Sequence, residues 1–318
     1  MNEAFGARVM TLEGLTNLYV LDSLKGFGPQ KFKQVYEAGL DPAHIIEDPK
    51  LLPVPGKKGD PIRDQLSTQK GALLEECRKR AEKQLKVAAS TQASIISYAS
   101  PFYPALGFQS NNPIALLYVR GNTEILKQRL AVACVGSRQL RPPFKEAHAA
   151  FARTAVAEGF VVVSGFALGA DTVGHEACVE SGGKTIAVMP SGLDRPFPPE
   201  NKALWERLLA ADQAVFVSEF PFGTGAASLN LRKRNKLIVA LARGVLVSQS
   251  SATGGAMNAY RFSVEQRKPS ATFEPDETED TSGNRLMLNE SPPATRLQVE
   301  SNCEREYTQW LALLASST

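Results

Sequence analysis

The segment FVVVSGFALGADTVGHEA (160–177) predicts a buried strand, a glycine-containing loop and a helix in direct succession. A continuous run of valines, without alternating polar residues, is typical of a strand covered on both faces in a parallel sheet. The loop from Gly165 to Gly169 follows that strand, and glycines allow a backbone to approach a ligand closely. Asp171 is interpreted as the cap of the helix and His175 as a structural histidine. The segment therefore favours an α/β fold with an anion site beyond the end of a strand.

The same alternation of strand and helix continues from residue 131 onward. The apolar runs that predict strands are AVACV, FVVVSG, TIAVMPSG, AVFVSEF and GVLVSQS, and helices are expected near 144–158, 171–181, 200–210, 231–243 and 255–266. This pattern predicts an extended Rossmann-like parallel sheet flanked by helices over residues 96–290. In such sheets, ligands bind beyond the carboxyl ends of the strands.

The segments outside this pattern have a different character. Residues 1–95 show helical apolar spacing and predict a small N-terminal helical domain, in which LKGFGPQKF (24–32) has the shape of a helix–hairpin–helix turn. The connector over 95–125 holds one or two short strands. Residues 274–294 are acidic and rich in turn-forming residues, which predicts a loop. Residues 291–318 are expected to form a C-terminal tail that ends in a helix.

Composition places few demands on function. The 318 residues carry a net charge of +3 and are 43% hydrophobic, as in ordinary globular proteins. The four cysteines form no Cys-x-x-Cys pair, so neither a disulfide framework nor a zinc site is expected. No signal peptide or membrane-spanning run is recognised, so a cytoplasmic location is expected. No acid–base or nucleophile pair can be assembled, so we expect no catalytic residues, no metal and no cofactor.

A cationic helix start is the most unusual feature of the charge pattern. Arg232, Lys233 and Arg234 follow one another directly, and Asn235 comes next. The positive end of the helix dipole makes this arrangement unfavourable by about 1 kcal/mol in isolation. No Asp or Glu occurs from residue 220 to 264, so no acid nearby in the sequence neutralises the charge. Phosphates of a bound polyanion would make this arrangement of cations favourable. We therefore interpret the segment as an anion site rather than a solvated face.

Other candidate phosphate contacts follow the ends of predicted strands. CVGSR supplies Ser137 and Arg138, and SATGGAMNAY supplies Gly254 and Gly255 at a helix start. An ordinary strand-to-helix turn is the alternative at each of these positions. SGGKT (181–185) is not a P-loop, because a strand follows it instead of preceding it.

Six motifs, taken in their order along the chain, resemble those of the DNA-processing protein A family (DprA, also called Smf): CVGSR, VVVSGFALGADTVGHEA, GGKTIAVMPSGLDRPFPPEN, SEFPFGT, NLRKRNKLIVALARGVLV and SATGGAMNAYRFSVEQ. The resemblance covers roughly residues 95–290. It implies an extended Rossmann domain that binds single-stranded DNA without sequence preference, displaces single-strand-binding protein, loads the RecA recombinase and forms a homodimer. The DNA-binding residues that it implies are Ser137, Arg138, the loop from Gly165 to Gly169, Arg232, Lys233, Arg234 and Asn235, with Lys184 and Arg195 as further positions in the same motifs.

A second function class is kept open, that of a nucleotide-binding sensor or a phosphoribohydrolase-like enzyme on a related Rossmann fold. Such hydrolases carry the motif PGGxGTxxE. Here Gly254 and Gly255 are not followed by Gly-Thr, and the first acid after them is Glu265. This argues against the hydrolase and leaves the sensor, beside a scaffold that retains only the fold.

Overall fold

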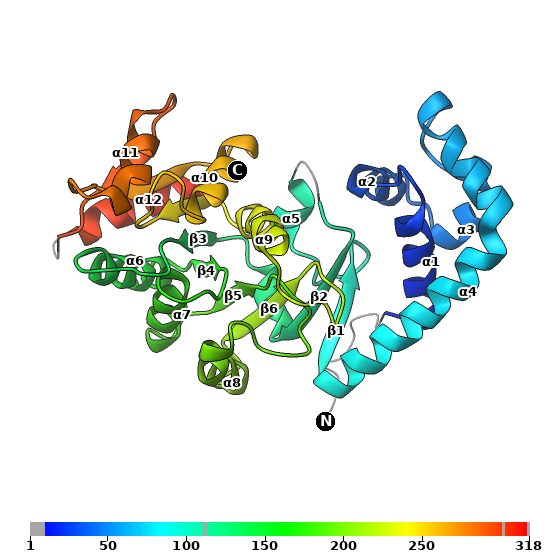
Figure 1. The fold of residues 1–318 in the computed structure, drawn as a ribbon, viewed down its shortest axis with the longest axis horizontal. Coiled ribbons are helices and arrows are strands. Elements are labelled where there is room, and N and C mark those ends of the chain that lie inside the picture. The colour runs from blue at the N-terminus through cyan, green and yellow to red at the C-terminus, as the bar shows by residue number, and fades with distance from the viewer. Residues whose placement is uncertain (1–9, 111–112, 301–302, 317–318) are drawn as a thin grey trace.

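The computed structural model describes residues 10–110, 113–300 and 303–316 of the chain. A helical part, coloured blue to cyan, lies at one end of the molecule, and the α/β part forms the rest (Figure 1). The predicted fold class, an extended Rossmann-like parallel sheet flanked by helices with a small N-terminal helical domain, is confirmed.

The helical part holds α1 (Leu12–Ser23), α2 (Pro29–Glu37), α3 (Pro42–Glu47) and α4 (Asp60–Thr91), with short 3₁₀ turns η1 (Pro49–Leu51) and η2 (Gly56–Lys58). The GFGP sequence joins α1 to α2 as predicted. Gly26 has a φ of +87° in this turn, a conformation that favours glycine. Pro29 begins α2, where its missing N–H costs no helical hydrogen bond.

The strands of the described residues form one nine-stranded sheet in the order β1-β2-β6-β5-β4-β3-β7-β8-β9. Their bounds are β1 (Ala93–Ser97), β2 (Leu116–Gly121), β3 (Ala131–Val135), β4 (Val161–Ser164), β5 (Thr185–Val188), β6 (Ala214–Ser218), β7 (Gly244–Val247), β8 (Ser270–Phe273) and β9 (Thr295–Leu297). The strands from β6 to β9 in this order are parallel, and β2 pairs antiparallel with both β1 and β6. The parallel part of the sheet starts at β3, adds β4 to β6 on one side and then crosses to β7 on the other. The boundary between β3 and β7 is therefore the switch point where such folds bind ligands.

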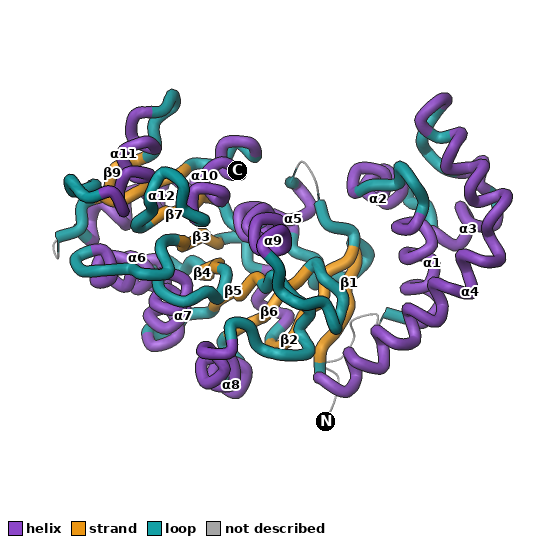
Figure 2. Tube along the Cα trace, in the orientation of Figure 1, coloured by secondary structure: helices purple, strands orange, loops and turns teal. Residues whose placement is uncertain are grey.

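Helices cover both faces of the sheet (Figure 2). They are α5 (Ala105–Gln109), α6 (Phe144–Ala157), α7 (Ala170–Glu180), α8 (Lys202–Ala210), α9 (Ser228–Ala240), α10 (Ala256–Glu265), α11 (Ser282–Asn289) and α12 (Glu304–Ser316), with 3₁₀ turns η3 (Thr123–Lys127), η4 (Pro199–Asn201) and η5 (Glu279–Thr281). Val132 and Cys134 of β3 pack in the core with α6, α7 and α12, whereas Ala133 and Val135 pack in the core with α9 and α10. The fully apolar strands predicted from the sequence are therefore buried on both faces.

Three elements beyond residue 269 were not predicted, namely β8, α11 and β9. The prediction of a loop over 274–294 is wrong where α11 lies. Asn284 fixes α11, because its side-chain amide donates to the carbonyls of Ser248 (2.9 Å) and Phe273 (3.2 Å) and its oxygen accepts from the Ser250 N–H. Within the predicted tail, β9 extends the sheet and α12 packs against α6.

The described residues were compared with the requirements of a membrane-spanning helix, a disulfide and a metal site. None of the described helices is long and apolar enough to cross a membrane. The four cysteines are buried and free. Within the same residues, no group of three His, Cys, Asp or Glu side chains is arranged to hold a metal ion.

Candidate nucleic-acid interface

The loops that follow β3, β4 and β7 meet at the carboxyl edge of the sheet. The Ser137 N–H donates to the Gln249 carbonyl (2.8 Å), and the Ala170 N–H donates to the Ser137 carbonyl (3.0 Å). Gly169 has a φ of +76°, and a Cβ there would lie 2.4 Å from the carbonyl oxygen of Arg138. Only glycine fits at that position, so the loop after β4 packs directly on the loop after β3.

The start of α9 belongs to the same edge. The Arg234 guanidinium extends beneath the loop after β4 and donates to the carbonyls of Gly165 and Val188, the latter at 2.8 Å. Because Gly165 follows β4 and Val188 ends β5, this side chain ties α9 to two strand ends. We call the continuous surface that results the carboxyl-edge lip; it consists of residues 136–141, 165–169 and 228–235.

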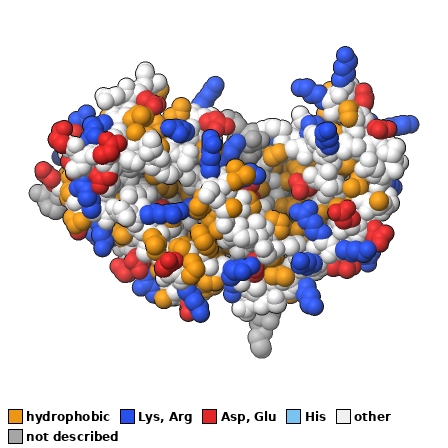
Figure 3. Space-filling view, in the orientation of Figure 1, with side chains coloured by type: hydrophobic (Ala, Val, Ile, Leu, Met, Phe, Trp, Pro, Cys, Tyr) orange, Lys and Arg blue, Asp and Glu red, His pale blue; other side chains and the backbone are white. Residues whose placement is uncertain are grey.

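Three cations of the carboxyl-edge lip face solvent, namely Arg138, Arg232 and Lys233. In the part of the chain that the structure describes, none of the three forms an ion pair, whereas Lys236 lies 3.7 Å from Glu265. Lys233 and Lys236 act to lower the pKa of Glu219, which burial nevertheless raises. In Figure 3, Lys and Arg side chains lie near the position of α9, whereas acidic and basic side chains are mixed on the side of α11 and α6. The three exposed cations give the lip a locally positive surface.

Arg234 does not lie on the surface as predicted. The residue is 5% exposed, because Arg234 shares the buried face of α9 with Leu237 and Ile238 at helical spacing. Burial lowers the pKa of Arg234, Asp171 raises it, and nearby Arg138 lowers it. A Cβ at Gly165 would collide with the guanidinium, so this glycine makes room for Arg234 rather than for a ligand. The helical periodicity of the segment contained the signal for this burial.

Two buried side chains support the loop after β4. Asp171 does not cap α7 as predicted; Gly169 occupies the cap position, and Asp171 Oδ2 accepts from the Ala167 N–H at 3.1 Å. Burial raises the pKa of Asp171 and the Arg234 charge opposes that rise. His175 Nδ1 lies 2.7 Å from Thr185 Oγ1, which itself donates to the Val162 carbonyl. Nδ1 therefore carries the proton, and His175 is a packed structural residue as interpreted.

The two further cations of the predicted site differ in position. Lys184 is exposed but directly precedes β5, and in a parallel sheet that places it at the amino edge, opposite the lip. The prediction that it joins the other cations is wrong for this topological reason. Arg195 follows β5 at the carboxyl edge, where its Nε lies 3.6 Å from Asp194 Oδ2. Its charge is thus paired, unlike that of Arg138.

The remaining predicted residues link α9 to α10. The Asn235 side-chain amide donates to the Gly255 carbonyl at 3.2 Å. A Cβ at Gly254 would lie 2.4 Å from Ser250 Oγ, so this glycine accommodates a neighbouring serine. Gly255 is exposed at the start of α10 and has open space where a Cβ would be. Of the two glycines, Gly255 is the one whose Cα faces open space, and its carbonyl is already bonded to Asn235.

Sequence reasoning missed an acidic clamp at the switch point. The clamp consists of Asp276, Asp280 and Thr278 together with the two side chains that bind them, Arg141 and Gln249. The Arg141 guanidinium donates to Asp280 (2.9 Å), Asp276 and Thr278, and the Gln249 amide donates to Asp280. Burial acts to raise the pKa of Asp276, but hydrogen bonds from Thr278 and Arg141 hold it well below its usual value. The run of acids from Glu274 to Asp280 was visible in the sequence, but its partner 135 residues away was not.

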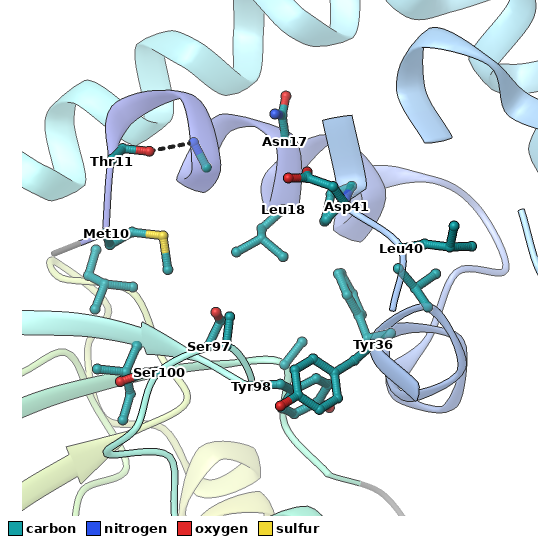
Figure 4. A pocket seen from close by; sticks show the side chains of 18 of the residues that line it. Met10, Thr11, Asn17, Leu18, Tyr36, Leu40, Asp41, Ser97, Tyr98 and Ser100 are labelled. Carbon is teal, nitrogen blue, oxygen red and sulfur yellow. Dashed lines mark hydrogen bonds between the residues drawn. The ribbon is translucent and has the colours of Figure 1, made fainter. Parts of the chain in front are cut away.

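A cavity lies away from the lip. It has a volume of about 730 Å³ and lies between α1, α2 and the edge strand β1 (Figure 4). Leu18, Met10 and Tyr36 project toward it from the helical part, and Ser97 and Tyr98 line it from the opposite side. Among the residues that the structure describes, its lining holds one charged side chain, that of Asp41, so these residues offer no counter-charge to a phosphate chain.

Known proteins share sequence similarity with this chain. A sequence profile described as DNA recombination-mediator protein A matches residues 94–306. Protein Smf of Synechocystis sp. is 33% identical over 168 residues, which span 52% of this chain and 42% of that protein. DNA processing protein DprA of Bacillus subtilis is 27% identical over 243 residues, which span 74% of this chain and 78% of that protein. The chain thus matches less than half the length of the Synechocystis relative.

Two solved structures agree with the sequence comparison. DprA of Streptococcus pneumoniae superposes with a TM-score of 0.69 at 23% identity, over 91% of this chain and 95% of that one, which shows the shared fold. DprA of Helicobacter pylori superposes with a TM-score of 0.61 at 26% identity, over 70% of this chain and 96% of that one, and its structure concerns a single-stranded DNA binding mode. The resemblance found in the sequence is confirmed, and the chain belongs to the DNA recombination-mediator protein A family.

Proposed function

We propose that this protein binds single-stranded DNA along the carboxyl-edge lip without sequence preference. The observation that carries the proposal is the group of exposed cations Arg138, Arg232 and Lys233, which no acid of the described residues pairs. Unpaired cations gathered at one edge favour a polyanion, because each phosphate that they neutralise releases condensed counterions. The H. pylori relative, whose structure concerns single-stranded DNA binding, supports the same ligand.

The positions of the helices add to this positive potential. The helices α7, α9 and α10 each follow a parallel strand, so each begins at the carboxyl edge and directs its N-terminal N–H groups there. Within the described residues, no side-chain hydrogen bond caps the start of α9 or α10. Backbone donors and cations at one edge suit phosphates, which carry no sequence information.

The nucleotide-sensor alternative has weaker support at the switch point. In doubly wound folds a mononucleotide binds with its phosphate at that crevice. Here the acidic clamp fills the position with Asp276 and Asp280, already bonded to Arg141. A second anion at that place would face two carboxylates, which disfavours it.

The family resemblance supports further parts of the proposal. We infer that the protein acts as a homodimer in the cytoplasm, carries no catalytic chemistry and delivers its DNA to the RecA recombinase. Adding RecA to the preformed DNA complex tests the delivery: faster RecA filament formation on DNA covered by single-strand-binding protein is expected, and an unchanged rate would remove this part of the proposal.

A binding titration with three ligands tests the central proposal. Fluorescence anisotropy compares a labelled single strand, the matching duplex and a labelled mononucleotide at several salt concentrations. We expect the single strand to bind tightest, with an affinity that falls steeply as salt rises. A preference for the mononucleotide would instead support the sensor.

A further inference from the structure

Two exposed leucines lie on the carboxyl-edge lip. Among the described residues, the large hydrophobic side chains with the greatest exposure are Tyr36, Leu51, Leu168, Leu229, Val264 and Leu313. Leu229, at 64% exposure, has the largest value of the set, and Leu168 is 39% exposed. The others lie in the helical part or on α10 and α12, away from the lip. The two lip leucines are therefore the most exposed large apolar side chains that a ligand on this surface would meet.

Each lip leucine stands beside an unpaired cation. Leu229 lies three residues before Arg232 and four before Lys233 on α9, so the three side chains share one face of the helix. Leu168 directly precedes Gly169, whose backbone packs on that of Arg138. Each lip leucine thus has a cation of the lip as a neighbour.

Neighbouring apolar and cationic groups match the chemistry of a single strand, in which charged phosphates lie beside bases whose faces are open. Duplex DNA stacks those faces against each other and hides them. Apolar contact with an open base removes exposed leucine surface from water, which stabilises the complex. Building on the proposed function, we propose that Leu168 and Leu229 contact nucleobases while the neighbouring cations contact phosphates. Together they favour single strands over duplexes.

The test uses leucine-to-alanine variants of the whole chain and two oligonucleotides. The probes are a labelled oligothymidine and a fully abasic strand of the same length and charge. We expect L168A and L229A each to weaken oligothymidine binding about fivefold, and to leave abasic binding and the salt slope unchanged. L51A is the matched control, because Leu51 is 43% exposed but lies in the helical part. Unchanged thermal midpoints would confirm that the variants fold.

Each outcome bears on the inference. If both lip variants bind oligothymidine like the wild type, the leucines do not contact bases and the inference is overturned. If the variants weaken abasic binding equally, the leucines act on the shape of the lip, which also overturns it. If the wild-type protein binds abasic and oligothymidine strands equally, base contact is absent although DNA binding stands. If it binds neither strand, the proposed function itself fails and the inference falls with it.

Discussion

At the scale of single residues, Arg234 determines whether the carboxyl-edge lip holds its shape. It is a buried cation that links α9 to the carbonyls of Gly165 and Val188, with the buried Asp171 nearby. The adjacent cations Arg232 and Lys233 are exposed to solvent, whereas Arg234 is buried and stabilises the fold. Its role is to position the loop after β4, and replacing it should alter stability before it alters DNA binding.

Replacing Arg234 by methionine should destabilise the fold by about 3 kcal/mol, because it leaves the Asp171 carboxylate buried without a cation. Urea unfolding of R234M against the wild type measures the destabilisation. The double variant D171N/R234M should recover part of the stability, since the uncompensated charge is gone. Equal stability of R234M and wild type would show that the buried cation is dispensable.

The two buried histidines predict reduced stability in mild acid. Burial is the main cause that lowers the pKa of His148 to about 4 and that of His175 to about 3. Between these values and the ordinary value of 6.5, the unfolded chain binds protons that the folded chain does not, so stability falls as pH drops below 6.5. From pH 6.5 to pH 5, each histidine should cost about 2 kcal/mol.

The raised pKa of the buried Asp171 acts in the opposite direction, so a variant is needed to isolate the histidine effect. Urea midpoints of H148L and wild type between pH 5 and pH 7.5 supply it. The fall of stability with acid should be about half as steep in H148L, because one of the two protonations is removed. Parallel pH profiles would contradict the prediction.

At the scale of elements, the acidic clamp holds the segment between β8 and α11 over the switch point. Arg141 is its centre, with its side chain 33% exposed and ion pairs to Asp276 and Asp280. R141A should lower stability by about 1 kcal/mol and raise amide hydrogen exchange over residues 274–289. Exchange in α4 is the internal control. Unchanged exchange in 274–289 would show that other interactions, such as those of Asn284, suffice.

The elements divide into those that the sequence predicts and those that depend on distant partners. The strands β3 to β7 and the helices between them were predictable, because buried valine runs and helical spacing are local signals. α11 was missed because the hydrogen bonds of Asn284 fix it, and β9 because two of its three residues are exposed. The position of Arg138 at the sheet edge could be predicted because Arg138 follows a strand. The burial of Arg234 could be predicted only by giving its helical spacing from apolar residues more weight than its charge.

At the scale of the whole molecule, the helical part is joined to the α/β part through buried polar contacts. Tyr19 of α1 and Tyr118 of β2 share a hydrogen bond of 2.6 Å between their hydroxyls. Gln84 of α4 bonds both the N–H and the carbonyl of Phe222, in the loop before α9. The helical part therefore touches the segment that leads into the lip.

The charge of the molecule is nearly balanced at +3, so binding of a polyanion depends on where the cations lie. The salt dependence of single-strand affinity tests that placement most directly, in the triple variant R138A/R232A/K233A with K184A as the control cation at the opposite edge. Removing one cation that neutralises a phosphate should reduce the slope of log affinity against log salt by about 0.7. We predict that the triple variant flattens this slope by about 2 and weakens binding to every sequence, while K184A keeps the wild-type slope. An unaltered slope in the triple variant, or an equal change in K184A, would contradict the assignment of the carboxyl-edge lip as the DNA-binding surface.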